Sequence, residues 1–335
     1  MSQGTADERD NAQVSPSASP PLVRRRFLAL LGALPALSVL TAGCSTRRLD
    51  GVHLTIATGS TDGVYHVLGS VLADAWAARL GIPRPTVLVT AGSVENVAKL
   101  RNREANVAFS QVDSAAEPAP GALPLQALAR VHDDYLHVVV RADLPARRLP
   151  ELRGTRVSIG SPHSGVQLTA RRLLAAAGLD PDRDVLAVQL GLNASIEALL
   201  ARRIDAFFWS GGLPTAGVRR LILSKEVPIR LLDLEDQVTV LRSEYGFYDA
   251  GTIPASTYSL GEPVTTLVVR NFLLVPADLR EEVAEALTRG LFDSLTDLAD
   301  ANPAARTIGL RSAIGTDPVP LHPGAERFYR SVKKR

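Results

Sequence analysis

Four short turns rich in glycine and serine contain the residues best suited to binding a small molecule. They are Gly59-Ser60-Thr61-Asp62-Gly63, Gly92-Ser93, Gly160-Ser161-Pro162-His163-Ser164-Gly165 and Ser210-Gly211-Gly212. A helix N-terminus offers unpaired backbone N–H groups and a partial positive charge, which suit a carboxylate or a phosphate. One such turn alone is better explained as a helix cap. Two turns from each of two lobes, facing one cleft, would instead form a binding site for a small anion.

The same residues offer little for catalysis or metal binding. The turn 160–165 has the outer glycines of a phosphate loop, but Val166 stands where that loop requires a lysine. The chain has no Gly-x-Ser-x-Gly nucleophile elbow, and its six histidines form no His-x-x-x-His pair. His163 precedes Ser164, but no carboxylate in the local sequence would orient it as a base. We therefore expect no enzyme, no cofactor and no metal site.

A repeated order of apolar strand, turn and amphipathic helix positions these turns. Strands are predicted at 52–57, 86–90, 106–110, 136–141, 156–160, 185–190, 204–209 and 265–270. Helices are predicted to begin at about Val64, Val94, Ser164 and Ser195. This alternation predicts an α/β fold with mostly parallel sheets and helices on both faces. In such sheets ligands bind beyond the carboxyl ends of the strands, which is where the turns lie.

Two of the predicted strands suggest a division into two lobes. The strands 136–141 and 265–270 have similar β-branched compositions, and each ends in an arginine. We interpret them as two hinge crossings between the lobes. Lobe 1 then comprises residues 51–138 and 270–335, and lobe 2 comprises residues 139–269.

The N-terminal region resembles an export signal. Arg24-Arg25-Arg26-Phe27-Leu28 matches a twin-arginine pattern, and an apolar run leads to Thr41-Ala42-Gly43-Cys44. The apolar run is interrupted by Gly32 and is shorter than the about 20 residues that span a bilayer. We predict that residues 1–43 are a disordered leader and a cleaved signal, and that Cys44 carries a lipid anchor. The protein would then lie on the outer face of the cell membrane or in the periplasm. The alternative is an uncleaved signal in which Cys44 is an ordinary thiol.

Composition limits the classes of function. Hydrophobic residues make up 46% of the chain and charged residues 21%, which predicts a packed core. The net charge of +2 includes the arginines of the signal, so no basic face for nucleic acid is expected. A single cysteine excludes an intrachain disulfide and a cysteine-based metal site.

Taken together, the motifs resemble the TAXI family of TRAP-transporter solute receptors. The matching segments keep the order of that family and extend over nearly all of the chain after the signal. They are Ile56–Tyr65 with Gly69, Ala91–Asn96, Gln111-x-Asp113, Leu152–Gly160, Ser164-Gly165 with Thr169–Arg171, Ile204–Phe208, Gly212-x-Pro214-Thr215 and Pro320–Ala325.

The resemblance implies a two-lobed periplasmic-binding-protein fold of type II. It also implies that the lobes close on a small organic carboxylate or an acidic amino acid, which is then passed to a TRAP-type membrane permease. The residues that match binding positions of the family are Gly59, Ser60, Tyr65, Ser93, Asn96 and Gln111 in lobe 1, and Ser161, Ser164, Gly165, Trp209 and Gly212 in lobe 2. Other interpretations assign Tyr65 to the core, and Asn96 and Gln111 to fixing the backbone of nearby turns.

The sequence departs from the family at a few of these positions. Asp62 replaces a usual glycine, Val166 a usual hydroxyl residue, and Trp209-Ser210 smaller apolar residues. Asp62 either faces water at a helix N-terminus or meets the amine of a zwitterionic ligand. The alternative functions are an accessory sensor for a membrane signalling kinase, an enzyme on the same scaffold, and a surface interaction protein with an unused cleft.

Overall fold

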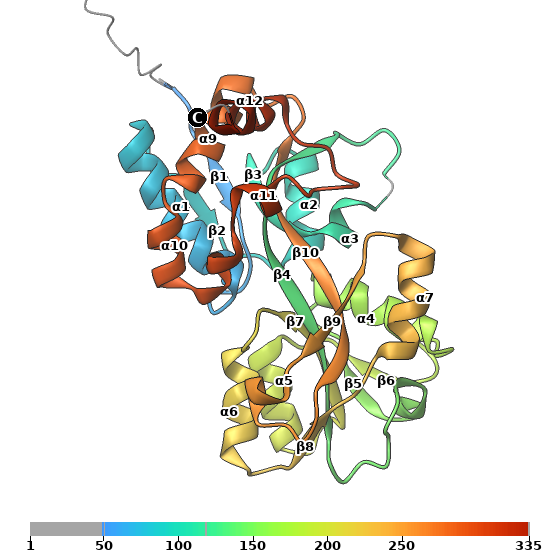
Figure 1. The fold of residues 1–335 in the computed structure, drawn as a ribbon. Helices are drawn as coiled ribbons and strands as arrows, with labels where there is room; N and C mark the ends of the chain where they lie inside the picture. Colours follow the sequence, from blue (N-terminus) through green and yellow to red (C-terminus); the bar gives the residue numbers. More distant parts are fainter. Residues whose placement is uncertain (1–48, 50, 118, 334–335) are drawn as a thin grey trace, which may run out of the picture. The chain divides into compact units, whose positions relative to one another are not determined.

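The structure is a computed structural model that describes Leu49, residues 51–117 and residues 119–333. The predicted signal and Cys44 therefore lie outside the described residues. The described residues form one compact unit, in which ten strands join in a single mixed sheet flanked by helices (Figure 1). The predicted α/β fold class is confirmed. Among the described residues, no helix is both long and apolar enough to cross a membrane.

One end of the sheet, here called the first half, consists of three parallel strands in the order β2-β1-β3. These strands are β1 (Thr55–Ala57), β2 (Thr86–Leu88) and β3 (Val107–Gln111). The helices of this half are α1 (Val64–Leu80), α2 (Ser93–Arg101), α3 (Val112–Ala115), α9 (Glu281–Phe292), α10 (Leu295–Ala301), α11 (Leu310–Ala313) and α12 (Pro323–Lys333). The last four of these helices follow the second crossing of the chain, so the chain returns to the half in which it began.

The other end, the second half, has the same arrangement. Strand β5 (Arg156–Ser158) pairs in parallel with β6 (Leu186–Val188) and β7 (Ala206–Gly211). The helices are α4 (Gly165–Ala176), α5 (Leu192–Leu200), α6 (Ala216–Ser224), α7 (Glu235–Tyr245) and α8 (Ala255–Tyr258). Two further strands, β8 (Ile229–Leu231) and β9 (Asp249–Ile253), pair with the long central strands. Short 3-10 helices lie at Leu149–Leu152 and Pro303–Thr307.

Two long antiparallel strands connect the halves: β4 (Leu125–Arg141) and β10 (Val264–Pro276). Strand β10 pairs with β3 in the first half, and β4 pairs with β7 in the second half. The predicted hinge strands 136–141 and 265–270 are parts of these two strands, whose remaining portions the sequence analysis missed. The ladder between them is broken by bulges at Asn271/Phe272 and Leu273/Leu274. The exact lobe limits stay a prediction.

The other predicted elements agree with the structure to within about three residues, with the largest differences at the starts of β1 and α5. That helix begins at Leu192 rather than at Ser195, because β6 ends early at Val188 and Gly191 takes the N-cap position. The three extra helical residues place the N-terminus of α5 beside the other helix N-termini described below.

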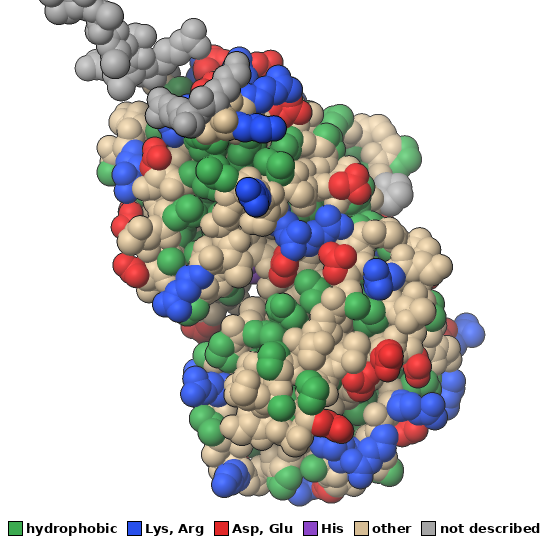
Figure 2. Space-filling model, viewed as in Figure 1, with side chains coloured by type: hydrophobic (Ala, Val, Ile, Leu, Met, Phe, Trp, Pro, Cys, Tyr) green, Lys and Arg blue, Asp and Glu red, His purple; other side chains and the backbone are tan. Residues whose placement is uncertain are grey.

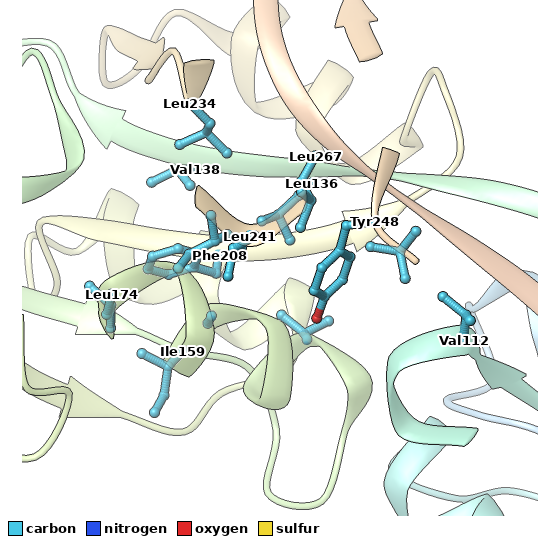
Figure 3. Close-up of a cluster of buried hydrophobic side chains, with 14 of the residues drawn as sticks. Val112, Leu136, Val138, Ile159, Leu174, Phe208, Leu234, Leu241, Tyr248 and Leu267 are labelled. Atoms are coloured by element: carbon cyan, nitrogen blue, oxygen red, sulfur yellow. The ribbon is translucent and has the colours of Figure 1, made fainter. Parts of the chain in front are cut away.

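Apolar side chains pack continuously from one half to the other. A cluster of buried residues includes Val112 from the first half, Leu136 and Leu267 from the crossing strands, and Phe208 from the second half (Figure 3). Tyr248 lies among these side chains in the same cluster. Burial of one such side chain contributes about 1.5–3 kcal/mol to stability. Separate clusters fill the remainder of each half.

Charged side chains of both signs are interspersed on the face drawn in Figure 2. No continuous basic surface covers this face, which agrees with the small net charge of +2.

Candidate ligand-binding cavity

A cavity of about 310 Å³ lies where the carboxyl ends of the parallel strands from both halves meet. Sites for small molecules typically measure about 300–1,000 Å³, so this one suits a small solute. Its wall consists of Gly59, Ser60, Asp62, Gly63, Val64, Tyr65, Thr90, Ala91, Gly92, Ser93, Gln111, His132, Asp134, Gly160, Ser161, Ser164, Gly165, Val166, Leu190, Gly191, Leu192, Asn193, Ala194, Trp209, Ser210 and Gly211.

Four helices begin at the wall of this cavity: α1, α2, α4 and α5. Their N-cap residues are Gly63, Gly92, Ser164 and Gly191, and all four line the cavity. The three glycines have no side chain with which to cap the first turn, so backbone N–H groups of these helices stay available to a ligand. The N-terminal ends of these four helices carry partial positive charges, which give this wall a positive potential. An anionic group is therefore the expected ligand feature here.

Glycine allows the two halves to approach closely at the cavity. Gly92 has a φ of +124°, which other residues rarely adopt, and a Cβ on it would lie 3.8 Å from Ser164 Cα. Nearby, the backbone N–H of Glu95 donates to the carbonyl of His163 at 3.1 Å. A Cβ on Gly165 would overlap Gln111 Oε1. The turns 92–95 and 163–165 thus join the halves at one side of the cavity.

Buried polar side chains form the floor of the cavity. Gln111 Nε2 donates to Ser210 Oγ at 2.7 Å and to Asp134 Oδ2 at 3.0 Å. The backbone N–H of Gln111 donates to Ser93 Oγ at 3.0 Å. All four side chains are buried, with exposed fractions of 2–6%. Gln111 Oε1 has no hydrogen-bond partner among the described residues; the atom is buried and lies against Gly165.

Tyr65 both packs against the core and lines the cavity. Its ring stacks on Phe109 with centroids 5.3 Å apart, and its hydroxyl donates to Asn271 Oδ1 and lies 3.3 Å from Ser93 Oγ. Burial raises the pKa of Tyr65 well above its usual value, and the nearby carboxylate of Asp134 adds to the effect. The hydroxyl stays neutral at physiological pH and acts as a hydrogen-bond donor.

His132 and Asp134 lie two residues apart on β4 and line the same cavity. His132 Nε2 is 3.4 Å from Asp134 Oδ1. Within the described part of the chain, neither ring nitrogen of His132 has a hydrogen-bond partner. These groups could orient a ligand, but the described residues contain no cluster of three His, Cys, Asp or Glu side chains that could hold a metal ion.

Nine of the eleven binding residues expected from the sequence line the cavity. They are Gly59, Ser60, Tyr65, Ser93, Gln111, Ser161, Ser164, Gly165 and Trp209. Asn96 is fully buried outside the wall and donates to the carbonyls of Thr58 at 2.5 Å and Phe109 at 2.8 Å. It therefore fixes the backbone of nearby segments, which was the alternative interpretation. Gly212 also lies outside the wall, where Gly211 takes its place, because β7 extends to Gly211.

Asp62 lies at the rim and is exposed. Its Oδ2 accepts a hydrogen bond of 2.9 Å from Asn193 Nδ2, at the start of α5. This bond connects the two halves across one edge of the cavity.

Residues 56–332 match the NMT1-like family. The chain belongs to this family.

Similar solved structures include XAC2383 from Xanthomonas citri bound to chloride ion, at 16% identity and a TM-score of 0.50, covering 84% of this chain and 96% of that one. The periplasmic aliphatic sulphonate binding protein SsuA from Escherichia coli matches at 14% identity and a TM-score of 0.43, over 83% and 82% of the two chains. An ancestral arginine-binding protein matches at 10% identity and a TM-score of 0.46, over 76% and 97%. The NMT1-like chain therefore shares its overall fold with XAC2383.

Sequence reasoning missed several cavity residues of this NMT1-like protein. His132 and Asp134 were missed because the strand containing them was predicted to begin only at residue 136. The polar run His132-Asp133-Asp134, in a largely apolar stretch, could have indicated cavity residues. The segment 190–194 was missed because Gly191, between a strand and a helix, was not recognised as a fifth turn of the same kind.

Proposed function

We propose that this NMT1-like protein is an exported solute receptor that binds a small organic carboxylate, including amino acids, and delivers it to a TRAP-type permease. The observation that carries the proposal is the convergence of four helix N-termini on one cavity of about 310 Å³. A carboxylate accepts hydrogen bonds from such N–H groups and is favoured by the helix dipoles. The permease partner rests on the resemblance of the motifs to the TAXI family, whose receptors pass their ligand to such a permease.

Ligand binding is tested by a thermal-shift screen of carboxylates, keto acids and amino acids. The protein is first denatured and refolded to remove ligand carried through purification. A ligand at a hundredfold excess over its dissociation constant should stabilise the protein by about 2.7 kcal/mol. The variant Ser161→Ala, which removes a hydroxyl at the wall, should weaken binding without unfolding the protein. A panel with no stabilising compound would contradict the receptor function.

The anchor at Cys44 forms a separate part of the proposal. We expect the wild-type protein in the membrane fraction of its own cell and the Cys44→Ser variant in the soluble exported fraction. Equal distribution of the two proteins would rule out lipidation without affecting the binding proposal.

A further inference from the structure

The charged side chains that line the cavity are all of one sign. Asp62 and Asp134 contribute carboxylates, whereas no lysine or arginine belongs to the described wall. Receptors that bind a free dianion need cationic side chains or many donors to balance its charge. Among the described lining residues, the helix N-termini supply positive potential, on the wall formed by the turns.

Asp134 is the decisive carboxylate because it is buried at the cavity floor, with an exposed fraction of 6%. Its Oδ2 accepts from Gln111 Nε2 at 3.0 Å and lies 3.4 Å from Ser210 Oγ. Its Oδ1 faces His132 Nε2 at 3.4 Å, which is longer than a normal hydrogen bond of this type. A carboxylate offers about four acceptor positions, so Asp134 can still accept from a ligand. Gln111 itself donates to Asp134 through Nε2, while its Oε1 is buried against Gly165, so Asp134 is the acceptor that this part of the floor offers.

The rest of the wall includes apolar side chains from both halves. Leu190, Leu192 and Trp209 come from the second half, together with Val166, and Val64 comes from the first. None of them can satisfy a charged or strongly polar ligand group.

We infer that the ligand is a zwitterion: its carboxylate lies at the helix N-termini, its ammonium group contacts Asp134, and its remainder is apolar. This inference rests on the proposed receptor function and narrows it to amino acids with an uncharged, apolar side chain. An acidic amino acid fits less well, because a second carboxylate is disfavoured both beside the apolar side chains and in the field of Asp134.

The test uses isothermal titration of the full chain, stripped of ligand, with four probes at pH 7. L-Leucine is the zwitterion, 4-methylpentanoate lacks the amine, L-leucinamide lacks the carboxylate, and L-glutamate carries a second carboxylate. We expect L-leucine to bind about 30-fold or more tightly than 4-methylpentanoate, since a buried charge-assisted contact is lost with the amine. L-Leucinamide and L-glutamate should both bind more weakly than L-leucine.

The variant Asp134→Asn should reduce the preference for L-leucine over 4-methylpentanoate to about threefold or less, by removal of the charged partner. Asp133→Asn is the matched control: Asp133 is the neighbour of Asp134, pairs with Arg130 and lies outside the cavity wall. That variant should keep the wild-type preference.

The outcomes separate this inference from the receptor function. If 4-methylpentanoate or L-glutamate binds wild type as tightly as L-leucine, the protein is a receptor and the zwitterion inference is wrong. An unchanged preference in Asp134→Asn also overturns it. If neither the four probes nor the carboxylate panel bind, both proposals fail. Should Asp134→Asn not fold, the wild-type comparison of the four probes decides alone.

Discussion

Asn96 shows how a residue type that suits binding can have a structural role instead. Its side chain is buried and makes three hydrogen bonds, to the carbonyls of Thr58 and Phe109 and with the hydroxyl of Thr90. The amide thereby holds the ends of β1 and β3 to the turn before α2. The sequence shows an amide near a Gly-Ser turn, but which acceptors surround it depends on strands that are distant in sequence.

Replacing Asn96 by alanine should lower the free energy of unfolding by about 2–4 kcal/mol, because buried carbonyls lose their donors. Urea unfolding measures the change. Asn102→Ala is the control, since Asn102 is exposed at the end of the same helix. This substitution should lower the free energy of unfolding by less than about 0.5 kcal/mol. If Asn96→Ala unfolded at the same urea concentration as the wild type, these hydrogen bonds would contribute nothing to stability.

His137 provides a pH-dependent test at the same scale. It is fully buried on β4, with Nε2 2.9 Å from the hydroxyl of Tyr258 and Nδ1 2.9 Å from the carbonyl of Tyr135. Burial lowers the pKa of His137 to about 4. Below about pH 6.5, His137 is therefore protonated in the unfolded chain but stays neutral in the folded protein. The free energy of unfolding falls with pH until the pKa of the folded state is reached.

We expect protonation of His137 to lower the free energy of unfolding by about 2–3 kcal/mol between pH 7 and pH 4.5. In His137→Gln, which keeps a donor and an acceptor, this part of the loss should vanish. Urea unfolding of both proteins at the two pH values measures it. Equal losses in wild type and variant would mean that His137 does not remain neutral in the fold.

At the scale of elements, the start of α4 is the most constrained part of the cavity. Ser164 caps the helix by accepting from the N–H of Gln167 at 3.2 Å, and Gln167 Oε1 accepts from the N–H of His163 at 3.1 Å. These two hydrogen bonds fix the backbone at the start of α4, where Gly165 lies against Gln111 and Ser93 of the first half. The helix and its cap were predictable from sequence, whereas the close approach of Gly165 to another element was not.

Gly165→Ala should weaken ligand binding about tenfold or more, because the added methyl group must displace Gln111 from the cavity floor. Gly212→Ala is the matched control. A Cβ there would meet only Ala304 Cβ, at an ordinary 3.6 Å, and Gly212 does not line the cavity. Titration of both variants with the best ligand of the screen checks this. If Gly212→Ala also lost much of its ligand affinity, Gly212 would belong to the binding site and this prediction would be wrong.

At the scale of the whole chain, local patterns predicted most strands and helices but not how far the two central strands extend. Strand β4 contains Arg130, His132, Asp133 and Asp134, which interrupt its apolar alternation, so only residues 136–141 looked like a strand. The polar interruption is tolerated because β10 pairs along this segment, the cavity receives His132 and Asp134, and Arg130 and Asp133 pair with each other. Tertiary pairing of this kind leaves no periodic signal in the sequence.

The continuous sheet and the shared core predict that residues 47–335 unfold as one cooperative unit. The chain has two tryptophans, Trp76 in α1 of the first half and Trp209 in β7 of the second. The variants Trp76→Phe and Trp209→Phe each leave one reporter. The two fluorescence transitions in urea should have the same midpoint as circular dichroism of the same variant. Separate midpoints within one variant would show that the halves unfold independently.

The bulges at Asn271/Phe272 and Leu273/Leu274 have a mechanical consequence. Because β4 and β10 cross between the halves as a paired ribbon, any change in the angle between the halves has to bend that ribbon. Bending costs least where the ladder is already interrupted, and Asn271 lies at such a point while holding the hydroxyl of Tyr65. Tyr65, which lines the cavity, therefore contacts the ribbon at one of its two interruptions.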